Sequence, residues 1–119
     1  MKPDSLRPAI TIDSQRRIYL SAESRKLIGL NSHGYRLIVG FDKANQRIIV
    51  AKPEIVRVPD VQSFKFDKKH YTHAKRMVRE LGFTDAELPL KFEYVGRDYS
   101  EYPSGAYAFQ RVGFDAPDK

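Results

Sequence analysis

The first part of the chain alternates short apolar and polar runs in a pattern that predicts two β-hairpins around a short helix. Alternating apolar positions predict one hairpin over residues 9–20 and a second over residues 35–52. Between them, the run AESRKLI predicts a helix over residues 22–28. Ser21 can accept hydrogen bonds from the free amides of its first turn, and Gly29 is a typical left-handed residue at its C-terminal end.

The second part of the chain predicts a strand, a helix and two further strands. Alternating apolar residues indicate strands over residues 61–66, 90–95 and 106–112. Asp67 can cap a helix over residues 68–81, because apolar residues recur there at spacings of three and four. This apolar stripe consists of Tyr71, Ala74, Val78 and Leu81. No internal repeat is evident.

These elements predict an α+β fold made of two small units. The expected organisation is a flexible arm at residues 1–9, a domain at 10–53, a linker at 54–60, a β-α-β-β domain at 61–112 and a tail at 113–119. The first domain is too small to bury enough area alone, so its apolar residues need a partner surface. We expect a second copy of the chain to provide it. The apolar residues of the first domain that need this surface are Ile10, Ile12, Ile18, Leu20, Leu27, Ile28, Leu37, Val39, Ile48 and Val50.

The composition excludes several classes of protein. Because the chain has no cysteine, disulfides, thiolate metal sites and thiol catalysis are excluded. The sequence has neither an apolar run long enough to span a membrane nor the apolar core of a signal peptide, so we expect a cytoplasmic protein. The net charge of +6 falls entirely within residues 1–53. This segregation favours a module that binds a polyanion.

Four cations of the first unit occupy positions suited to nucleic acid. Arg16 and Arg17 lie in the turn of the first hairpin, and Arg25 and Lys26 lie on the short helix. Arginine suits this role because its planar guanidinium can bridge phosphate oxygens or a guanine edge and stays protonated.

The arrangement ITIDSQRRIYLSAESRKLIGL…YRLIVGFD…RIIVAKP, within residues 10–53, resembles the swapped-hairpin DNA-binding domain of the AbrB, MazE and SpoVT superfamily. The matching positions are Asp13, Arg17, Ile18, Leu20, Glu23, Arg25, Lys26, Ile28, Gly29 and Leu30. Arg16 stands where the family usually has a turn glycine, so either it adopts an unfavourable backbone angle or the turn type differs. Ser21 replaces the usual proline, and Ile10 occupies a position that is basic in some members. We recognise no resemblance in the second half.

The resemblance implies an AbrB-like swapped-hairpin barrel, in which the hairpins of two chains interleave to form a homodimer. It also implies a prokaryotic or phage transcriptional regulator that binds double-stranded DNA, with no cofactor. Its DNA contacts would come from Arg16, Arg17, Arg25 and Lys26 of both chains. Candidate further contacts are Arg7, Arg36 and Arg47.

The second half leaves its own role open. Tyr99, Tyr102 and Tyr107 give it a tyrosine-rich loop, which is typical of protein-interaction and oligomerisation surfaces. His70 and His73 are too few for a transition-metal site, and no nucleophile or carboxylate pattern predicts an enzyme. The alternative function is an antitoxin-type protein that binds DNA through its first half and a toxin or other protein through its second half.

Overall fold

The computed structural model describes residues 7–30, 34–56, 63–97 and 102–114, and these residues form eight strands and two helices. In chain order the elements are β1 (Ala9–Ile12), β2 (Arg17–Leu20), α1 (Ala22–Ile28), β3 (Tyr35–Asp42), β4 (Arg47–Ala51), β5 (Ser63–Phe66), β6 (Tyr71–His73), α2 (Lys75–Glu80), β7 (Leu90–Gly96) and β8 (Tyr107–Arg111). No helix among them is long and apolar enough to cross a membrane.

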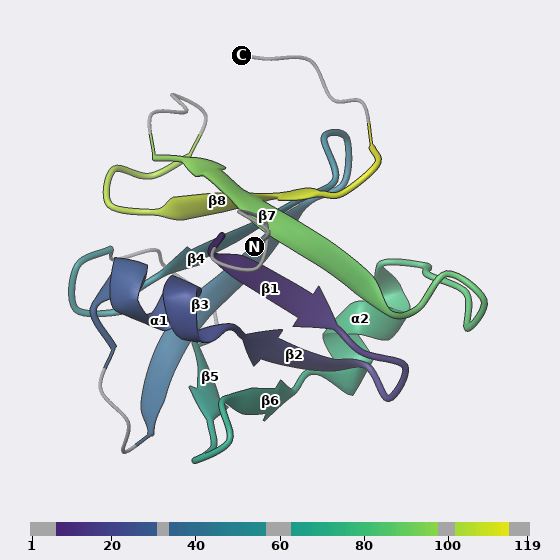
Figure 1. Cartoon of the computed structure of the whole chain (residues 1–119), viewed down its shortest axis with the longest axis horizontal. Coiled ribbons are helices and arrows are strands. Elements are labelled where there is room, and N and C mark those ends of the chain that lie inside the picture. The colour runs from purple at the N-terminus through teal and green to yellow at the C-terminus, as the bar shows by residue number, and fades with distance from the viewer. Residues whose placement is uncertain (1–6, 31–33, 57–62, 98–101, 115–119) are drawn as a thin grey trace, which may run out of the picture.

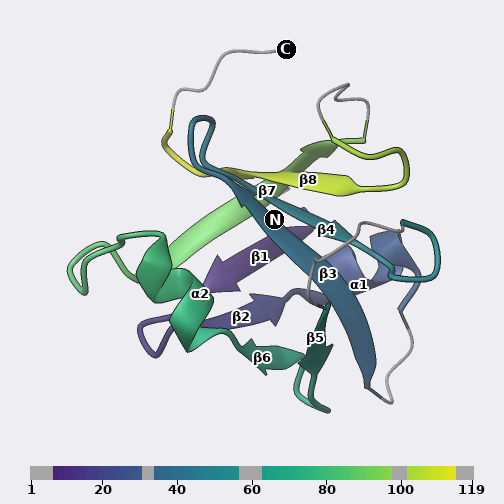
Figure 2. The same cartoon turned by 180° about the vertical axis from the view of Figure 1, so that it is seen from behind.

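The eight strands form one antiparallel sheet that curls into a nearly closed barrel. The order of hydrogen-bonded neighbours is β5-β3-β4-β8-β7-β1-β2-β6. The two edge strands, β5 and β6, follow each other along the chain, and the Asp67 N–H donates to the Tyr71 carbonyl at 2.9 Å across their turn. Figures 1 and 2 show the barrel from opposite sides, with one helix on each flank. The α+β class predicted from the sequence is confirmed.

The two halves of the chain share this sheet. Every strand of the first half lies beside a strand of the second: β1 pairs with β7, β2 with β6, β3 with β5 and β4 with β8. Residues 10–53 and 61–112 are therefore interleaved, which corrects the expectation of two separate units. The expected arm also changes, because Ala9 belongs to β1 and the Pro8 carbonyl accepts a hydrogen bond from the Tyr94 N–H.

The core explains why the halves interleave. Nine of the ten apolar residues that need a partner surface are buried, and Leu27 is half-buried. They belong to one cluster with side chains of the second half, among them Phe66, Val78, Phe92 and Phe109. The chain itself thus supplies the surface for which a second copy was expected, and this removes the reason for predicting a homodimer.

The predicted helix over residues 68–81 is wrong at its first turns. Residues 67–70 form a turn, residues 71–73 form β6, and α2 covers only Lys75–Glu80. The Asp67 carboxylate binds backbone N–H groups of the turn, and the residues that follow gain ladder hydrogen bonds from β2. In contrast, the helix predicted over residues 22–28 is confirmed, with Ser21 as N-cap and Gly29 left-handed at its end.

The structure contains an internal repeat that the sequence pattern did not reveal. Each half has the order strand, strand, helix, strand, strand. Exchanging β1, β2, β3 and β4 with β5, β6, β7 and β8, respectively, leaves the order of neighbours around the barrel unchanged. Corresponding strands of the two halves therefore have corresponding neighbours in the sheet, so the halves are related by an approximate two-fold symmetry.

We predict that shortening a core side chain of the second half destabilises the first half equally. Phe92 of β7 is fully buried and lies opposite Ile10 of β1. Phe92→Ala should lower the free energy of unfolding by about 3–5 kcal/mol. Amide hydrogen exchange in β1 and β2 should accelerate as much as in β7 and β8. Val95→Ala, at an exposed position of the same strand, is the control. Undiminished protection of β1 and β2 in Phe92→Ala would show that the first half is stable on its own.

Candidate nucleic-acid interface

The turn between β1 and β2 is held by one carboxylate. Oδ1 of Asp13 accepts hydrogen bonds from the backbone N–H groups of Gln15 at 3.0 Å and Arg17 at 2.8 Å. The Arg16 N–H donates to the Asp13 carbonyl at 2.9 Å, and Arg16 has a φ of 63°. Of the two outcomes expected at this position, the chain adopts the unfavourable angle, since the surrounding hydrogen bonds fix the turn.

Both arginines of this turn are bound to acidic side chains. Arg17 donates from Nε to Oδ2 of Asp13 at 2.8 Å, and its guanidinium lies 4.2 Å from the centre of the Tyr71 ring. Nη2 of Arg16 lies 2.8 Å from Oδ1 of Asp85. The Arg17 side chain is 30% exposed and that of Arg16 18%, so Arg17 is the more accessible. Its guanidinium is already oriented before any ligand binds.

The turn between β5 and β6 has the same geometry. Oδ1 of Asp67 accepts hydrogen bonds from the backbone N–H groups of Lys69 at 2.9 Å and Tyr71 at 3.0 Å. The His70 N–H donates to the Asp67 carbonyl at 2.9 Å, and His70 has a φ of 70°. The bond from Tyr71 is the main cause that lowers the pKa of Asp67, so this carboxylate is charged at neutral pH.

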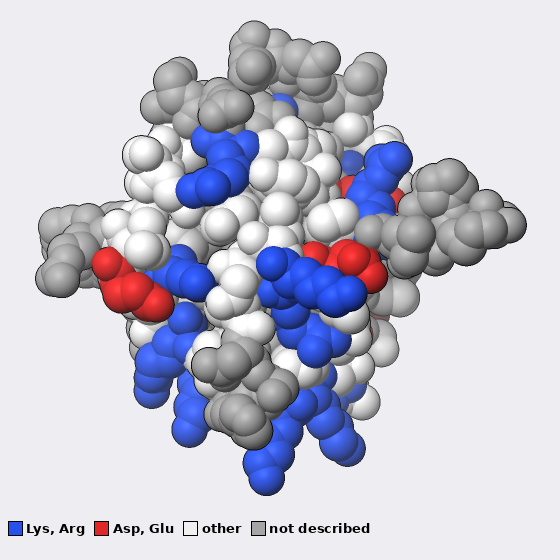
Figure 3. Space-filling view, turned by 60° about the vertical axis from the view of Figure 1, so that its left-hand side comes forward, with Lys and Arg blue, Asp and Glu red and all other residues white. Residues whose placement is uncertain are grey.

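Exposed cations surround this second turn. Lys68 and Lys69 form its tip, and Arg36 of β3 lies opposite Lys65 of β5 in the neighbouring ladder. Figure 3 shows Lys and Arg side chains gathered at this end of the molecule, with the visible acidic side chains above them. None of these four cations makes an ion pair with an acidic residue that the structure describes. Their charges are therefore available to a polyanion.

Arg25 joins α1 to the second turn. Its Nη1 lies 2.6 Å from Nε2 of His70, and its Nε donates to the Ser21 carbonyl at 3.3 Å. A guanidinium can only donate, so Nε2 accepts, and Nδ1 carries the proton that it donates to the Tyr35 hydroxyl at 3.0 Å. Burial, and then the charge of Arg25, lower the pKa of His70. Burial also raises the pKa of Tyr35 to about 12.

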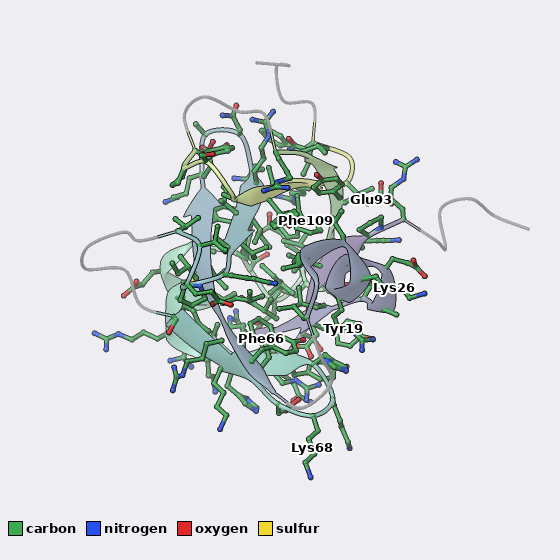
Figure 4. All side chains as sticks on the ribbon, turned by 90° about the vertical axis from the view of Figure 1, so that its left-hand side faces the viewer. Tyr19, Lys26, Phe66, Lys68, Glu93 and Phe109 are labelled. Atoms are coloured by element: carbon green, nitrogen blue, oxygen red, sulfur yellow. The ribbon has the colours of Figure 1, made fainter. Side chains whose placement is uncertain are left out.

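Lys26, the next residue of α1, is exposed and makes no ion pair within the described part of the chain. In Figure 4, Lys26 and Lys68 point away from the barrel, whereas Phe66 and Phe109 lie inside it. The two halves of the chain thus each contribute an outward lysine to the surface around α1 and the second turn.

The outward side chains of β2 and β6 connect the two turns, and we call them the shared strip. Arg17 lies opposite His73, and Tyr19 lies opposite Tyr71. Their neighbour Ile18 points inward and is fully buried. The ring centroids of the two tyrosines are 4.9 Å apart. Because β2 and β6 are antiparallel and each follows its own turn, the two turns lie at opposite ends of the shared strip.

The three arginines that were candidates for further DNA contacts differ in their exposure. Arg7 is exposed and forms an ion pair with Glu93 at 3.3 Å. Arg36 is exposed near the second turn, as described above. Arg47 is only 2% exposed, and its Nε donates to Oε1 of Gln110 at 2.7 Å. The expectation of a DNA contact at Arg47 is therefore corrected, because its side chain is buried against other residues of the chain.

The predicted protein-interaction tyrosines have partners within the chain. The Tyr102 hydroxyl donates to Oδ2 of Asp42. The guanidinium of Arg97 lies over the Tyr107 ring, 4.6 Å from the centre of that ring. Burial opposes a low pKa at Asp42, but the hydrogen bonds from Tyr102 and Asn45 lower it. Tyr102 and Tyr107 are half-buried. Tyr99 lies outside the described residues.

Several basic residues of this surface were missed because their half of the chain is neutral overall. Residues 63–79 contain six Lys or Arg and only one acidic residue, and this local excess is the signal that the charge of the whole half conceals. The missed residues are Lys65, Lys68, Lys69, His73 and Lys75. Two of them, His73 and Lys75, lie at the first turn, where a hollow is lined by Ser14, Gln15, Arg16, Arg17, His73 and Lys75.

Comparison of the chain with protein-family models, with curated proteins and with solved structures finds no match. Any functional conclusion therefore depends on the residues of the sequence and on the geometry described above.

We predict that His70 makes stability depend on pH. Its folded-state pKa lies below the value of about 6.5 for an unfolded chain, so the unfolded chain binds a proton first as the pH falls. The contribution of neutral His70 is complete above about pH 6.5 and is lost as the pH falls toward the folded-state pKa. His70→Asn, which tolerates a positive φ, should reduce the loss of unfolding free energy between pH 7 and pH 5.

Urea denaturation at the two pH values measures this effect. His73→Asn, at an exposed position of β6, is the matched control and should retain the pH dependence of the parent protein. An equal loss of stability in His70→Asn and the parent would contradict the assignment of a neutral His70 bound to Arg25.

Proposed function

We propose that this protein is a transcriptional regulator of AbrB type that binds double-stranded DNA through the shared strip and the turns at its two ends. The observation that carries the proposal is the position of two turns with basic side chains at opposite ends of one outward strip. The four residues expected to contact DNA lie on or beside this surface, namely Arg16, Arg17, Arg25 and Lys26.

The cations on this surface suit different parts of a duplex. Arg17 is oriented by Asp13 and Tyr71, and its planar fork can meet a guanine edge. Lys68 and Lys69 are exposed point charges that suit phosphate oxygens. If about four cations contact phosphates, a plot of log affinity against log salt should have a slope of about −4.

A duplex suits the strip better than a single strand does. Proteins that bind single strands stack unpaired bases on exposed aromatic faces. The Tyr71 ring instead contacts Tyr19, whose ring centroid is 4.9 Å away, and the guanidinium of Arg17, which lies 4.2 Å from its centre. The ring is thus already engaged by side chains of the same strip, which favours contact with the grooves and backbone of paired DNA.

The interleaved fold argues against the alternative of an antitoxin with a separate toxin-binding half. Strands β5, β6, β7 and β8 each pair with a strand of the first half. Among the described residues, the second half therefore serves as part of the barrel and not as an extended tail. No observation on this surface favours a toxin as partner.

We predict that Arg17 contributes directly to duplex affinity. Arg17→Gln should weaken binding to a preferred genomic fragment by about tenfold, in line with about 1–3 kcal/mol for a bidentate base contact. Arg17→Lys, which keeps the charge but not the planar fork, should lose most of the sequence preference. Fluorescence anisotropy with labelled duplexes measures both effects.

Lys43→Gln is the control for loss of one exposed charge, since Lys43 lies in the β3–β4 turn. Circular dichroism of each variant verifies that the barrel remains folded. Parent affinity and parent preference in Arg17→Gln would exclude the shared strip as the DNA contact.

A further inference from the structure

The two turns that flank the shared strip are equivalent in backbone and different in chemistry. In both, one aspartate accepts from the N–H groups two and four residues later, and the residue before the second strand has a positive φ. The equivalent residues are Ser14 and Lys68, Gln15 and Lys69, Arg16 and His70, and Arg17 and Tyr71.

The register of β2 and β6 shows that the axis of the approximate two-fold relation between the halves passes between these two strands. Exchange of the halves brings Arg17 to Tyr71 and Tyr19 to His73. In the ladder, Arg17 lies opposite His73 and Tyr19 lies opposite Tyr71. The pair Ile18 and Thr72 therefore marks the pseudo-two-fold axis, and each turn lies on its own side of it.

The two ends offer DNA different groups. At the first end the exposed tip is uncharged, and Arg17 is the accessible arginine, oriented by Asp13. At the second end the tip consists of Lys68 and Lys69, and the position equivalent to Arg17 is a tyrosine. The first end has a group that can distinguish bases, whereas the second has charges that bind phosphate without reading sequence.

We propose that one chain alone occupies a DNA site and reads it asymmetrically, with Arg17 contacting base edges at one end and Lys68 and Lys69 anchoring phosphates at the other. A homodimer presents two identical ends and so prefers a palindromic site. One chain with two unlike ends prefers a non-palindromic site. This inference rests on the proposed function, because it assigns roles within the same DNA-binding surface.

Charge removal at the second end tests the assigned roles. The double variant Lys68→Gln/Lys69→Gln should weaken binding to all duplexes equally and reduce the magnitude of the salt slope by about 2, while the preferred sequence stays the same. The matched control is Lys43→Gln/Arg97→Gln, which removes two exposed charges elsewhere. The β3–β4 turn and the end of β7 lie opposite the β5–β6 turn in Figure 1. The control should keep the parent slope.

Selection from random duplexes and the stoichiometry of the complex test the asymmetry. The full chain should select a consensus without dyad symmetry, and sedimentation on a duplex of about 20 base pairs should show one chain per duplex. A palindromic consensus, no consensus, two chains per duplex, or a lysine variant equal to its control would each overturn this inference and leave DNA binding in place. Absence of any duplex binding by the parent chain would instead refute the proposed function.

Discussion

Backbone hydrogen bonds between β2 and β6 join the two halves of the chain at the centre of its outward strip, and three further ladders repeat this connection around the barrel. The buried apolar side chains of the two halves belong to shared clusters, so neither half has a core of its own. Ile10, Ile12, Ile18 and Leu20 become buried because Phe66, Phe92 and Phe109 close the other side of the same interior. This shared burial fixes the position of each turn relative to the other, so the surface is a consequence of the core.

Two aspartates, Asp13 and Asp67, fix the turns that carry the basic side chains. Each carboxylate accepts backbone N–H groups of its own turn and thereby holds the following strand in register. At the first turn Asp13 also orients the Arg17 guanidinium. At the second turn, neutral His70 accepts a hydrogen bond from Arg25 and donates one to Tyr35, which links the turn to α1 and β3. The cations are therefore carried by a framework that is ordered before any ligand binds.

The local elements of the first half could be predicted because they depend on nearby residues: Ser21 caps α1, Gly29 ends it, and alternation marks the strands. The helix over residues 68–81 could not be distinguished from a turn and a short strand, because its apolar spacing fits both and the choice depends on pairing with β2. Arg47 was wrongly expected to be exposed for a related reason. On the outer face of β4, Ile49 and Ala51 pack against Val56 and Ala106, and Arg47 donates to Gln110, so alternation does not separate an exposed from a buried side of this strand. That the second half buries the apolar residues of the first half depends on contacts between residues far apart in the sequence, which local patterns do not show. The internal repeat was missed because the two halves differ too much in sequence.

The most direct test of a barrel closed within one chain is a disulfide between its halves. Thr11 of β1 and Lys91 of β7 lie opposite each other, and opposed Cα atoms in an antiparallel ladder are about 4.5–5.5 Å apart, within the range that a disulfide spans. The chain has no cysteine of its own, so Thr11→Cys/Lys91→Cys introduces a unique pair. After mild oxidation, the protein should migrate as a single chain on a non-reducing gel and should still bind duplex DNA. Disulfide-linked dimers, or the absence of any crosslink, would contradict the pairing of the two halves within one molecule.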